Sequence, residues 1–203
     1  VELPLIGEFN VDNVLTTLGV LRALGLAPTA ALAALSGVSA PPGRMEAISA
    51  PGRALAIIDY AHTPDALAKA LRAARVHCDG ELHVVFGCGG DRDRGKRPMM
   101  ASVAAELADQ VVITDDNPRS EDPASIRAAV MAGAMDAGTE ARIEEVGDRA
   151  KAILIGVDAL GPGDALLICG KGHESGQIIG DQTLPFDDAE QASIAVAALE
   201  GTI

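Results

Sequence analysis

Short apolar runs that alternate with helical patterns place the strongest constraint on the fold of this chain. Leu82–Phe86, Val111–Thr114 and Ala165–Cys169 are almost continuously apolar, and stretches of helical length separate them. Strands that are apolar on both faces are typical of a parallel sheet covered by helices on both sides. The alternation therefore predicts an α/β fold with a mainly parallel sheet.

The remaining elements follow from the same periodicities. Further strands are expected at Met45–Ser49, Ala54–Tyr60 and Arg142–Val146, with a Pro51-Gly52 turn between the first two and a hairpin around Gly180-Asp181. Helices are expected at Asn10–Leu26, Thr29–Leu35, Pro64–Val76, Pro98–Ala108, Pro123–Ala137, Arg149–Leu160 and Ala189–Leu199. Thr63 is a suitable N-cap for the helix that begins at Pro64.

A domain boundary is expected at Ala40-Pro41-Pro42-Gly43, the strongest linker signal in the chain. The piece before it is too short to bury a stable core of its own. We therefore expect residues 1–43 to be the end of one domain, whose larger part lies upstream, and residues 44–203 to form a second domain.

Composition narrows the classes of function. The net charge of −13 argues against a nucleic-acid partner, which requires a basic face. No apolar run approaches the length of a membrane span. The three cysteines, Cys78, Cys88 and Cys169, include no CxxC pair, which favours free thiols in a reducing cytoplasm.

Four loops that follow expected strands carry nearly all of the candidate chemistry. They are Asp59–Pro64, Gly87–Pro98, Asp115–Arg119 and Gly170–Glu174. Because the carboxyl ends of parallel strands meet at one edge of a sheet, we expect these loops to lie together and to bind a ligand there.

The loop Gly87–Pro98 is rich in arginine and glycine, which suits an anion. The spacing Gly90-x-x-x-x-Gly95-Lys96 fits a Walker A motif, but Arg97 stands where the hydroxyl for Mg²⁺ belongs. Guanidinium groups match a carboxylate or phosphate on a substrate better. The alternative is a lattice of Asp91, Arg92, Asp93 and Arg94 that only orders the loop.

The other three loops favour a zwitterionic ligand or a nucleotide. Asp116-Asn117-Pro118-Arg119 can hold an ammonium and a carboxylate, or can be an ordinary turn before a helix. Gly170–Glu174 can form an anion nest with Glu174 as an ammonium acceptor. Asp59 can bind a ribose hydroxyl and His62 a phosphate, although His62 can also be a plain helix-entry residue. No spacing of ligands favours a metal site.

Taken together, these motifs resemble the Mur ligases. The matching segments are Gly7-x-Phe9-Asn10-x-x-Asn13, Gly43-Arg44-Met45-Glu46, Asp59–Pro64, Gly87–Pro98, Asp116–Arg119 and Gly170–Glu174, in this order. The resemblance covers essentially the whole chain. The resemblance is strongest to the Mur ligases that add meso-diaminopimelate, which are distinguished by the sequence Asp-Asn-Pro-Arg.

The resemblance implies the end of a central ATPase domain at residues 1–43, followed by a Rossmann-like C-terminal domain. It implies an ATP-dependent, cytoplasmic amide ligase of peptidoglycan synthesis that activates UDP-MurNAc-L-Ala-D-Glu as an acyl phosphate. The phosphate-binding loop and the Mg²⁺ ligands are expected upstream of Val1, so the chain alone is expected to be inactive.

The resemblance also assigns residues to ligands. It implies that Arg119 faces the distal carboxylate of meso-diaminopimelate, which lysine lacks. The residues implied to bind this amino acid are Arg92, Asp116, Asn117, Pro118, Arg119, Gly170 and Glu174. ATP contacts are carried onto Asn13, Arg44, Asp59 and, more loosely, His62. No residue is singled out as a chemical catalyst.

Three rival functions remain. A stand-alone amino-acid-binding module leaves the nucleotide motifs at Asn13 and Arg44 unexplained. A related Mur or folylpolyglutamate-type ligase shares the Asp-x-Ala-His pattern but is disfavoured by Asp116–Arg119. An independent P-loop NTPase is disfavoured by Arg97.

Overall fold

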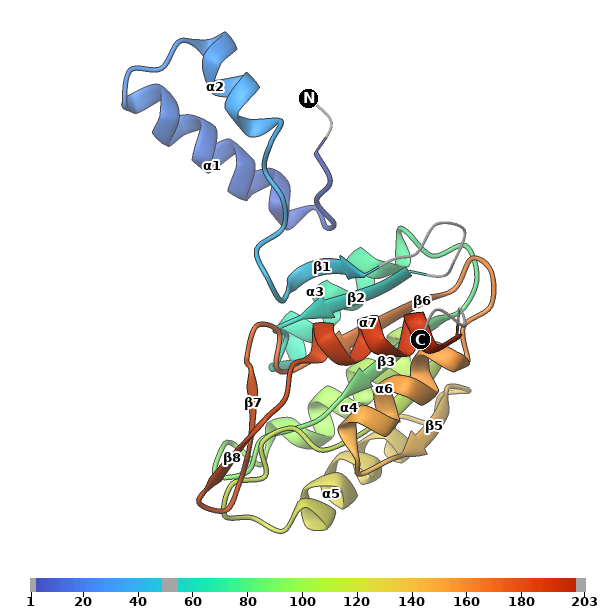
Figure 1. The fold of residues 1–203 in the computed structure, drawn as a ribbon. Coiled ribbons are helices and arrows are strands. Elements are labelled where there is room, and N and C mark those ends of the chain that lie inside the picture. The colour runs from blue at the N-terminus through green and yellow to red at the C-terminus, as the bar shows by residue number, and fades with distance from the viewer. Residues whose placement is uncertain (1–2, 49–54, 200–203) are drawn as a thin grey trace.

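A six-stranded sheet forms the centre of the molecule in the computed structural model, which describes residues 3–48 and 55–199 (Figure 1). The strand order is β1-β2-β6-β3-β4-β5. The strands are β1 (Arg44–Ile48), β2 (Leu55–Asp59), β3 (Leu82–Phe86), β4 (Gln110–Ile113), β5 (Arg142–Glu145) and β6 (Ala165–Cys169). All neighbours pair in parallel except β1, which runs antiparallel to β2 at one edge. The mainly parallel α/β fold predicted from the sequence is confirmed.

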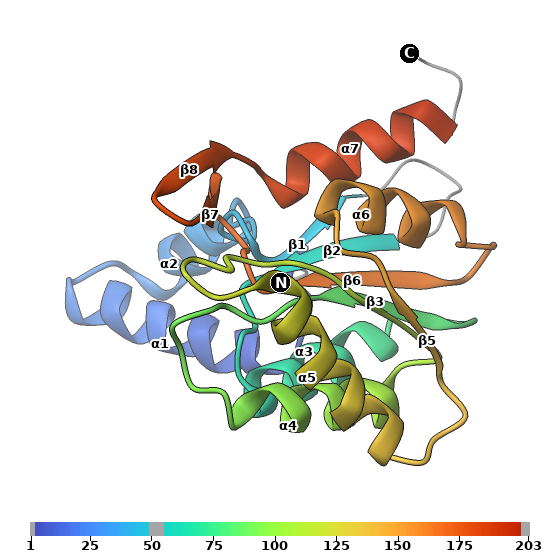
Figure 2. The same cartoon turned by 90° about the horizontal axis from the view of Figure 1, so that it is seen from below.

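Helices cover both faces of this sheet (Figure 2). α3 (Pro64–Arg75), α4 (Lys96–Leu107) and α5 (Pro123–Asp136) pack on one face, and α6 (Arg149–Asp158) and α7 (Asp188–Leu199) pack on the other. Every residue of β3 and β6 is buried, because helices lie against both of their faces. A separate hairpin of β7 (Gly176–Ile179) and β8 (Gln182–Pro185) turns at Gly180.

The register of the parallel strands brings the four candidate loops to one edge. Asp59 pairs with Cys169, Cys169 with Phe86, and Phe86 with Ile113. The strands β2, β6, β3 and β4 therefore end at the same level, and the loops that follow them are neighbours. This confirms the expected placement of the four loops at one edge of the sheet.

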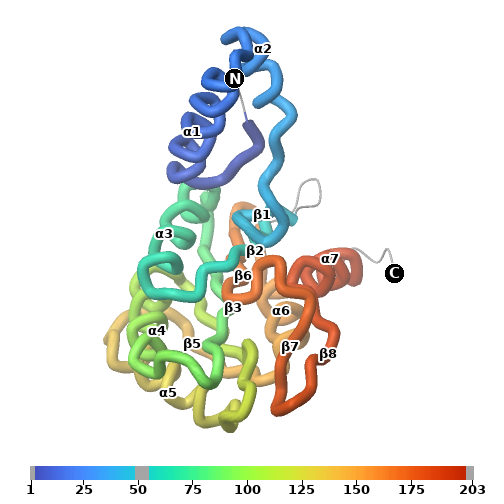
Figure 3. Tube along the Cα trace, turned by 90° about the vertical axis from the view of Figure 1, so that its left-hand side faces the viewer, coloured from blue at the N-terminus to red at the C-terminus, as the bar shows by residue number. Residues whose placement is uncertain are grey.

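Two N-terminal helices stand apart from the sheet (Figure 3). α1 (Phe9–Ala23) contains no buried residue, and α2 (Pro28–Leu35) buries only Ala31 and Leu35. Apolar side chains of α1 such as Val11 and Leu15 are more than half exposed. This part of the chain therefore buries little apolar surface within the described residues.

The boundaries of several elements differ slightly from expectation. α1 ends at Ala23 instead of Leu26, because Gly25 takes a positive φ of 91° that stops the helix. α4 begins at Lys96, two residues before Pro98, which a helix tolerates in its first turn. The Thr63 side chain caps α3 as predicted, accepting a hydrogen bond from the Ala66 amide at 3.3 Å. The expected turn at Pro51-Gly52 lies outside the described residues.

Candidate functional site

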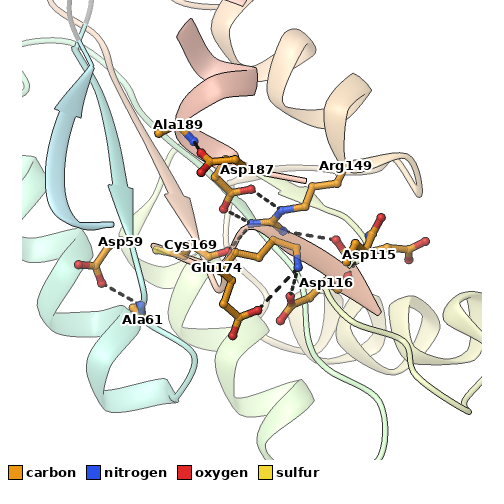
Figure 4. A network of polar contacts seen from close by, with 12 residues as sticks. Asp59, Ala61, Asp115, Asp116, Arg149, Cys169, Glu174, Asp187 and Ala189 are labelled. Carbon is orange, nitrogen blue, oxygen red and sulfur yellow. Dashed lines mark hydrogen bonds and ion pairs between the residues drawn. The ribbon is translucent and has the colours of Figure 1, made fainter. Parts of the chain in front are cut away.

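Four polar side chains from the loops after β4 and β6 form a connected group, which we call the inner polar cluster: Asp116, Asn117, Lys171 and Glu174. Asn117 Nδ2 donates to Glu174 Oε2 at 2.9 Å, and Lys171 Nζ donates to Asn117 Oδ1 at 2.9 Å. Lys171 Nζ also lies 3.5 Å from Asp116 Oδ1. In Figure 4 Glu174 and Asp116 lie on the same side of Arg149. The two loops therefore lie in direct contact.

The cluster is largely withdrawn from water. Asp116 is 9% exposed, Asn117 3% and Lys171 0%, whereas Glu174 is partly exposed at its outer end. Burial lowers the pKa of Lys171, and the Asp116 carboxylate opposes that shift. Asp116 Oδ1 is buried with no hydrogen-bond partner among the described residues. The Lys171 ammonium, 3.5 Å away, compensates for the charge of this oxygen.

Gly170 is required at the start of the loop after β6. Its φ is 117°, a backbone conformation that side chains rarely adopt, and a Cβ there would lie 3.5 Å from Asp116 Oδ2. The glycine lets the chain turn sharply out of the sheet beside Asp116. This places Lys171 and Glu174 against the neighbouring loop.

A buried ion pair lies next to the inner polar cluster, where α6 begins (Figure 4). Arg149, the first residue of α6, donates to both carboxylate oxygens of Asp188 at 2.7 Å, and both side chains are 0% exposed. Arg149 also donates to the Cys169 and Asp115 carbonyl oxygens. The pKa of Arg149 is raised because the favourable charge and hydrogen bonds of Asp188 outweigh the effect of burial. The pair ties the ends of β4 and β6 to α7.

The arginines of the loop Gly87–Pro98 divide into structural and exposed groups. Arg97 is buried and donates to Glu121 at 2.9 Å and to the Gly89 carbonyl oxygen. Arg94 pairs with Glu121, and Asp91 accepts from Ser120. The loop is thus ordered by contacts with the neighbouring loop after β4. Arg94 and Asp91 thus find partners across the two loops, whereas Asp93 accepts from the Gly95 amide within its own loop, so the contacts of the described residues differ from a lattice of internal Arg–Asp pairs.

Arg92 and Arg119 are the two arginines whose side chains lie beside Gly89 at this edge of the sheet. Arg119 donates to the Gly90 carbonyl oxygen at 2.8 Å, and Arg92 is exposed and donates to the Asp91 carbonyl oxygen. A Cβ on Gly89 would lie 2.8 Å from Arg119 Nη1 and 3.7 Å from Arg92 Cγ, so both side chains flank Gly89. Neither arginine forms an ion pair with any residue in 3–48 or 55–199. Because Gly89 has no side chain, the Arg119 guanidinium can lie against it.

Pro118 completes the link between the two loops. Its carbonyl oxygen would lie 1.9 Å from a Cβ on Gly90, so the backbones of the two loops touch there. Arg119 has a φ of 52°, and its amide donates to the Ile178 carbonyl oxygen of β7. Asp116–Arg119 is therefore a turn before α5 whose residues Asp116 and Asn117 also belong to the inner polar cluster.

A separate cavity of about 420 Å³ lies between α1, β1 and α3, and we call it the Arg44 cavity. It is lined by Phe9, Asn10, Asn13, Pro41, Arg44, Asp59, Ala66, Lys69 and Ala70. The structure thus brings together three of the four residues that the resemblance assigns to ATP. Burial raises the pKa of Asp59, although the Ala61 and Met45 amides donate to its carboxylate.

His62, the fourth of these residues, does not line the Arg44 cavity. Its Nδ1 lies 3.0 Å from the Tyr60 carbonyl oxygen and its ring contacts the Tyr60 ring edge-on, with centroids 4.7 Å apart. The Arg44 guanidinium lies over the Tyr60 ring, with its Cζ atom 4.5 Å from the ring centroid. The Tyr60 ring also lies 5.4 Å from the His173 ring, centroid to centroid. Sequence reasoning gave Tyr60 no role, because Arg44 and His173 meet its ring only in the fold.

Glycines join the Arg44 cavity to the inner polar cluster. A Cβ on Gly43 would lie 2.1 Å from both the Gly172 carbonyl carbon and the His173 nitrogen. The segment before β1 therefore rests directly on the loop after β6. We call this contact the glycine seam.

Neither a phosphate loop nor a metal site is built by the described residues. Lys96, the lysine of the Walker-like spacing, donates to the His62 carbonyl oxygen at 2.8 Å. Within residues 3–48 and 55–199, no group of three His, Cys, Asp or Glu side chains is placed to hold a metal ion. The helices of this part of the chain are also too short or too polar to cross a membrane.

Comparison with known proteins identifies related sequences across the whole chain. The family profile described as "Mur ligase, glutamate ligase domain" matches residues 43–172. The chain is 49% identical over all 203 residues to the UDP-N-acetylmuramoyl-L-alanyl-D-glutamate--2,6-diaminopimelate ligase of Agrobacterium fabrum, and 50% identical over 198 residues to that of Bradyrhizobium diazoefficiens. It spans about 40% of the length of each relative.

A solved structure agrees with the sequence comparisons. A UDP-N-acetylmuramoyl-L-alanyl-D-glutamate--2,6-diaminopimelate ligase superimposes with a TM-score of 0.76 at 40% identity. The match covers 98% of this chain and 40% of that chain.

Proposed function

The chain belongs to the Mur ligase family, and we propose that it is the amino-acid-recognising part of an ATP-dependent ligase that adds meso-diaminopimelate to UDP-MurNAc-L-Ala-D-Glu. The relatives at 48–50% identity carry the name of this activity. The chain spans about 40% of their length, so the part of the reaction that we assign to it rests on its own residues.

The observation that carries the proposal is the pairing of two kinds of group at one edge of the sheet. The inner polar cluster offers the acceptors Asp116 and Glu174, which suit an ammonium group. Arg119 and Arg92 flank Gly89 in the adjoining loop and suit carboxylates. Diaminopimelate carries two ammonium and two carboxylate groups, so its ends match this arrangement.

We assign the distal carboxylate to Arg119. L-Lysine has no carboxylate at that end, so its binding would leave the guanidinium of Arg119 without a charged partner. A polar group that is desolvated without a partner costs about 1–3 kcal/mol, and more if it is charged. Discrimination against lysine then follows from a lost contact and needs no steric clash.

The Arg44 cavity supports a nucleotide site beside the amino-acid site. Asn13, Arg44 and Asp59 offer an amide, a guanidinium and a carboxylate, which suit the ribose and phosphates of ATP. ATP supplies the phosphoryl group that converts the D-glutamyl carboxylate into an acyl phosphate. We place the Mg²⁺ ligands and the phosphate-binding loop of that step in the part of the relatives that this chain does not span.

The role of this chain in the ligation is to position an amine. The neutral amine nitrogen of the bound amino acid attacks the acyl phosphate carbon, the bond from that carbon to the phosphate oxygen breaks, and the nitrogen loses one proton as the amide forms. Holding the amine within reach of that carbon supplies much of the rate, because orientation replaces a bimolecular encounter. We further propose that residues 1–43 belong to the preceding ATP-binding domain and that residues 44–203 close on it.

The test is calorimetric titration of meso-diaminopimelate and L-lysine into the chain and its Arg119→Ala variant. We expect binding of meso-diaminopimelate only, and loss of that binding in the variant. Arg142→Ala is the matched control, because Arg142 is exposed at the opposite end of the sheet. Equal binding of both amino acids would overturn the specificity, and robust Mg²⁺-dependent ATP hydrolysis by this chain alone would favour an independent NTPase.

A further inference from the structure

Lys171 is the one member of the inner polar cluster to which the family resemblance assigns no ligand contact. Its side chain is 0% exposed, and its Nζ donates to Asn117 Oδ1 at 2.9 Å and to the Gly176 carbonyl oxygen at 2.7 Å. The same atom lies 3.5 Å from Asp116 Oδ1 and 3.8 Å from Glu174 Oε2. A buried ammonium is retained only where polar partners compensate for the loss of water, and here the partners are the candidate substrate contacts themselves.

Lys171 fixes the orientation of the Asn117 amide. The Oδ1 atom accepts from two donors, Lys171 Nζ and the Ile178 amide, each at 2.9 Å. A flipped amide would turn its NH₂ group against both donors, so only one orientation satisfies the hydrogen bonds. In that orientation Nδ2 donates to Glu174 Oε2 and holds this carboxylate in place.

Lys171 also sets the charge of the cluster. Asp116 and Glu174 are two carboxylates, and Lys171 is the ammonium among them. Arg149, which lies behind the cluster, is matched by its buried partner Asp188, and Arg119 is assigned to the distal carboxylate of the substrate. One negative charge is therefore left over, which suits one ammonium group of an incoming amino acid.

We propose that Lys171 is a positioning residue for the amino-acid substrate, acting through Asn117 and Glu174 without contacting the substrate itself. By locking the amide and balancing one of two carboxylates, it presents Glu174 and Asp116 as a preformed acceptor for a single ammonium. The identity of the substrate rests on the proposed function, whereas the effect of Lys171 on Asn117 does not.

The first test therefore needs no substrate. The side-chain NH₂ resonances of Asn117 are followed by NMR in the 203-residue chain, with Lys171→Met compared against the surface control Lys151→Met. We expect the Asn117 resonances to shift and broaden in Lys171→Met and to stay unchanged in the control. Unchanged Asn117 resonances in a folded Lys171→Met variant would overturn the proposal.

The second test measures kinetics in the ligase that contains this chain. Lys171→Met is expected to raise the KM for meso-diaminopimelate about 10–100-fold, because misplacing a positioning group by about 1 Å has effects of this size. The KM for ATP should stay within about twofold of wild type, since the Arg44 cavity is separate. A merely structural role for Lys171 would move both KM values together, which would contradict the proposal.

A double-mutant cycle separates action through Asn117 from direct contact. In an Asn117→Ala background, Lys171→Met should add less than threefold to the KM for meso-diaminopimelate, because the amide to be oriented is gone. A full additive effect would instead assign Lys171 a direct contact and overturn its positioning role. If Lys171→Met does not fold, Lys171→Leu gives the same comparisons, because it also removes the donor to Asn117 Oδ1.

Failure of the proposed function gives a different pattern. A wild-type ligase that ignores meso-diaminopimelate would refute the substrate, while the NMR comparison would still decide whether Lys171 orients Asn117.

Discussion

The inner polar cluster and the Arg44 cavity lie at the same edge of one sheet, yet their side chains differ in burial and in partners. Asp116, Asn117 and Lys171 are buried and bonded to one another across two loops. Asn13 and Arg44 are exposed, and Asn13 lies on α1, a helix that buries no residue. The first site is held by the fold of the sheet domain, and the second is only partly enclosed.

The inner polar cluster is therefore preorganised, whereas the Arg44 cavity is only partly enclosed. Buried and mutually bonded groups are held in place before a ligand arrives, which lowers the ordering cost of binding. Exposed side chains on a weakly packed helix must be ordered when the ligand binds. We therefore expect changes near the inner polar cluster to alter stability and amino-acid binding together, and changes around the Arg44 cavity to leave the fold nearly intact.

The largest effect is expected from breaking the ion pair behind the cluster. Arg149→Met leaves Asp188 buried without its cation, which should cost about 3–5 kcal/mol of the free energy of unfolding. Chemical denaturation measures this loss. Because Arg149 also holds the Cys169 and Asp115 carbonyl oxygens, binding of meso-diaminopimelate should weaken as well.

Two comparisons control this experiment. Arg142→Met removes an exposed pair with Glu81 and should change stability little. Arg149→Met combined with Asp188→Leu removes both charges and should recover most of the loss. A single Arg149→Met variant as stable as wild type would show that the cluster does not depend on this support.

A smaller effect is expected at the glycine seam, where the two regions touch. Gly43 has a φ of 65°, and a Cβ there would overlap the backbone of Gly172 and His173. Gly138 has a nearly equal φ of 63° but no atom within 4 Å of its Cβ position. Gly43→Ala should therefore cost about 1–3 kcal/mol more than Gly138→Ala in thermal or chemical unfolding, since only the former is overpacked.

The seam variant also tests whether the two regions communicate. Gly43→Ala should disturb both the Arg44 cavity and the loop Gly170–Glu174, visible as shifted amide resonances on both sides. Equal costs for the two alanine variants, with shifts confined to the neighbours of residue 43, would show that the regions are independent.

The smallest effect is expected on the free energy of unfolding, from the titration of Asp59 in the Arg44 cavity. Burial raises the pKa of this carboxyl above its ordinary value of 3.8. The folded state therefore holds the proton more tightly than the unfolded state, so stability should fall as the pH rises from about 3.8 through the folded pKa. A carboxyl-carbon NMR titration measures the folded pKa directly, and a midpoint at or below 3.8 would contradict the prediction.

Much of the fold was predictable because its signals are local. Continuous apolar runs indicated buried parallel strands, and Thr63 indicated where α3 begins. The convergence of four loops at one edge followed from the topology alone. Boundaries such as the start of α4 were missed by two residues, because a first-turn proline does not mark the first residue of a helix.

The partners of the charged residues were less predictable. The composition of the loop Gly87–Pro98 could not reveal that Arg97 pairs with Glu121 or that Arg119 lies over Gly90. Arg149 carries no local signal, since an arginine at the start of a helix is ordinarily exposed. Lys171 lay within a recognised motif, but its burial became evident only with β7 packed beside it.

The sequence by itself determined which residue types reach the carboxyl edge of the sheet, because strand periodicity and loop position are properties of neighbouring residues. The tertiary structure decided which of those side chains are buried, which pair with one another, and which stay available for a ligand. Those outcomes depend on contacts between residues far apart in the chain, such as Asn117 and Glu174, which are 57 residues apart. Such contacts are set by packing and desolvation, which no local pattern records.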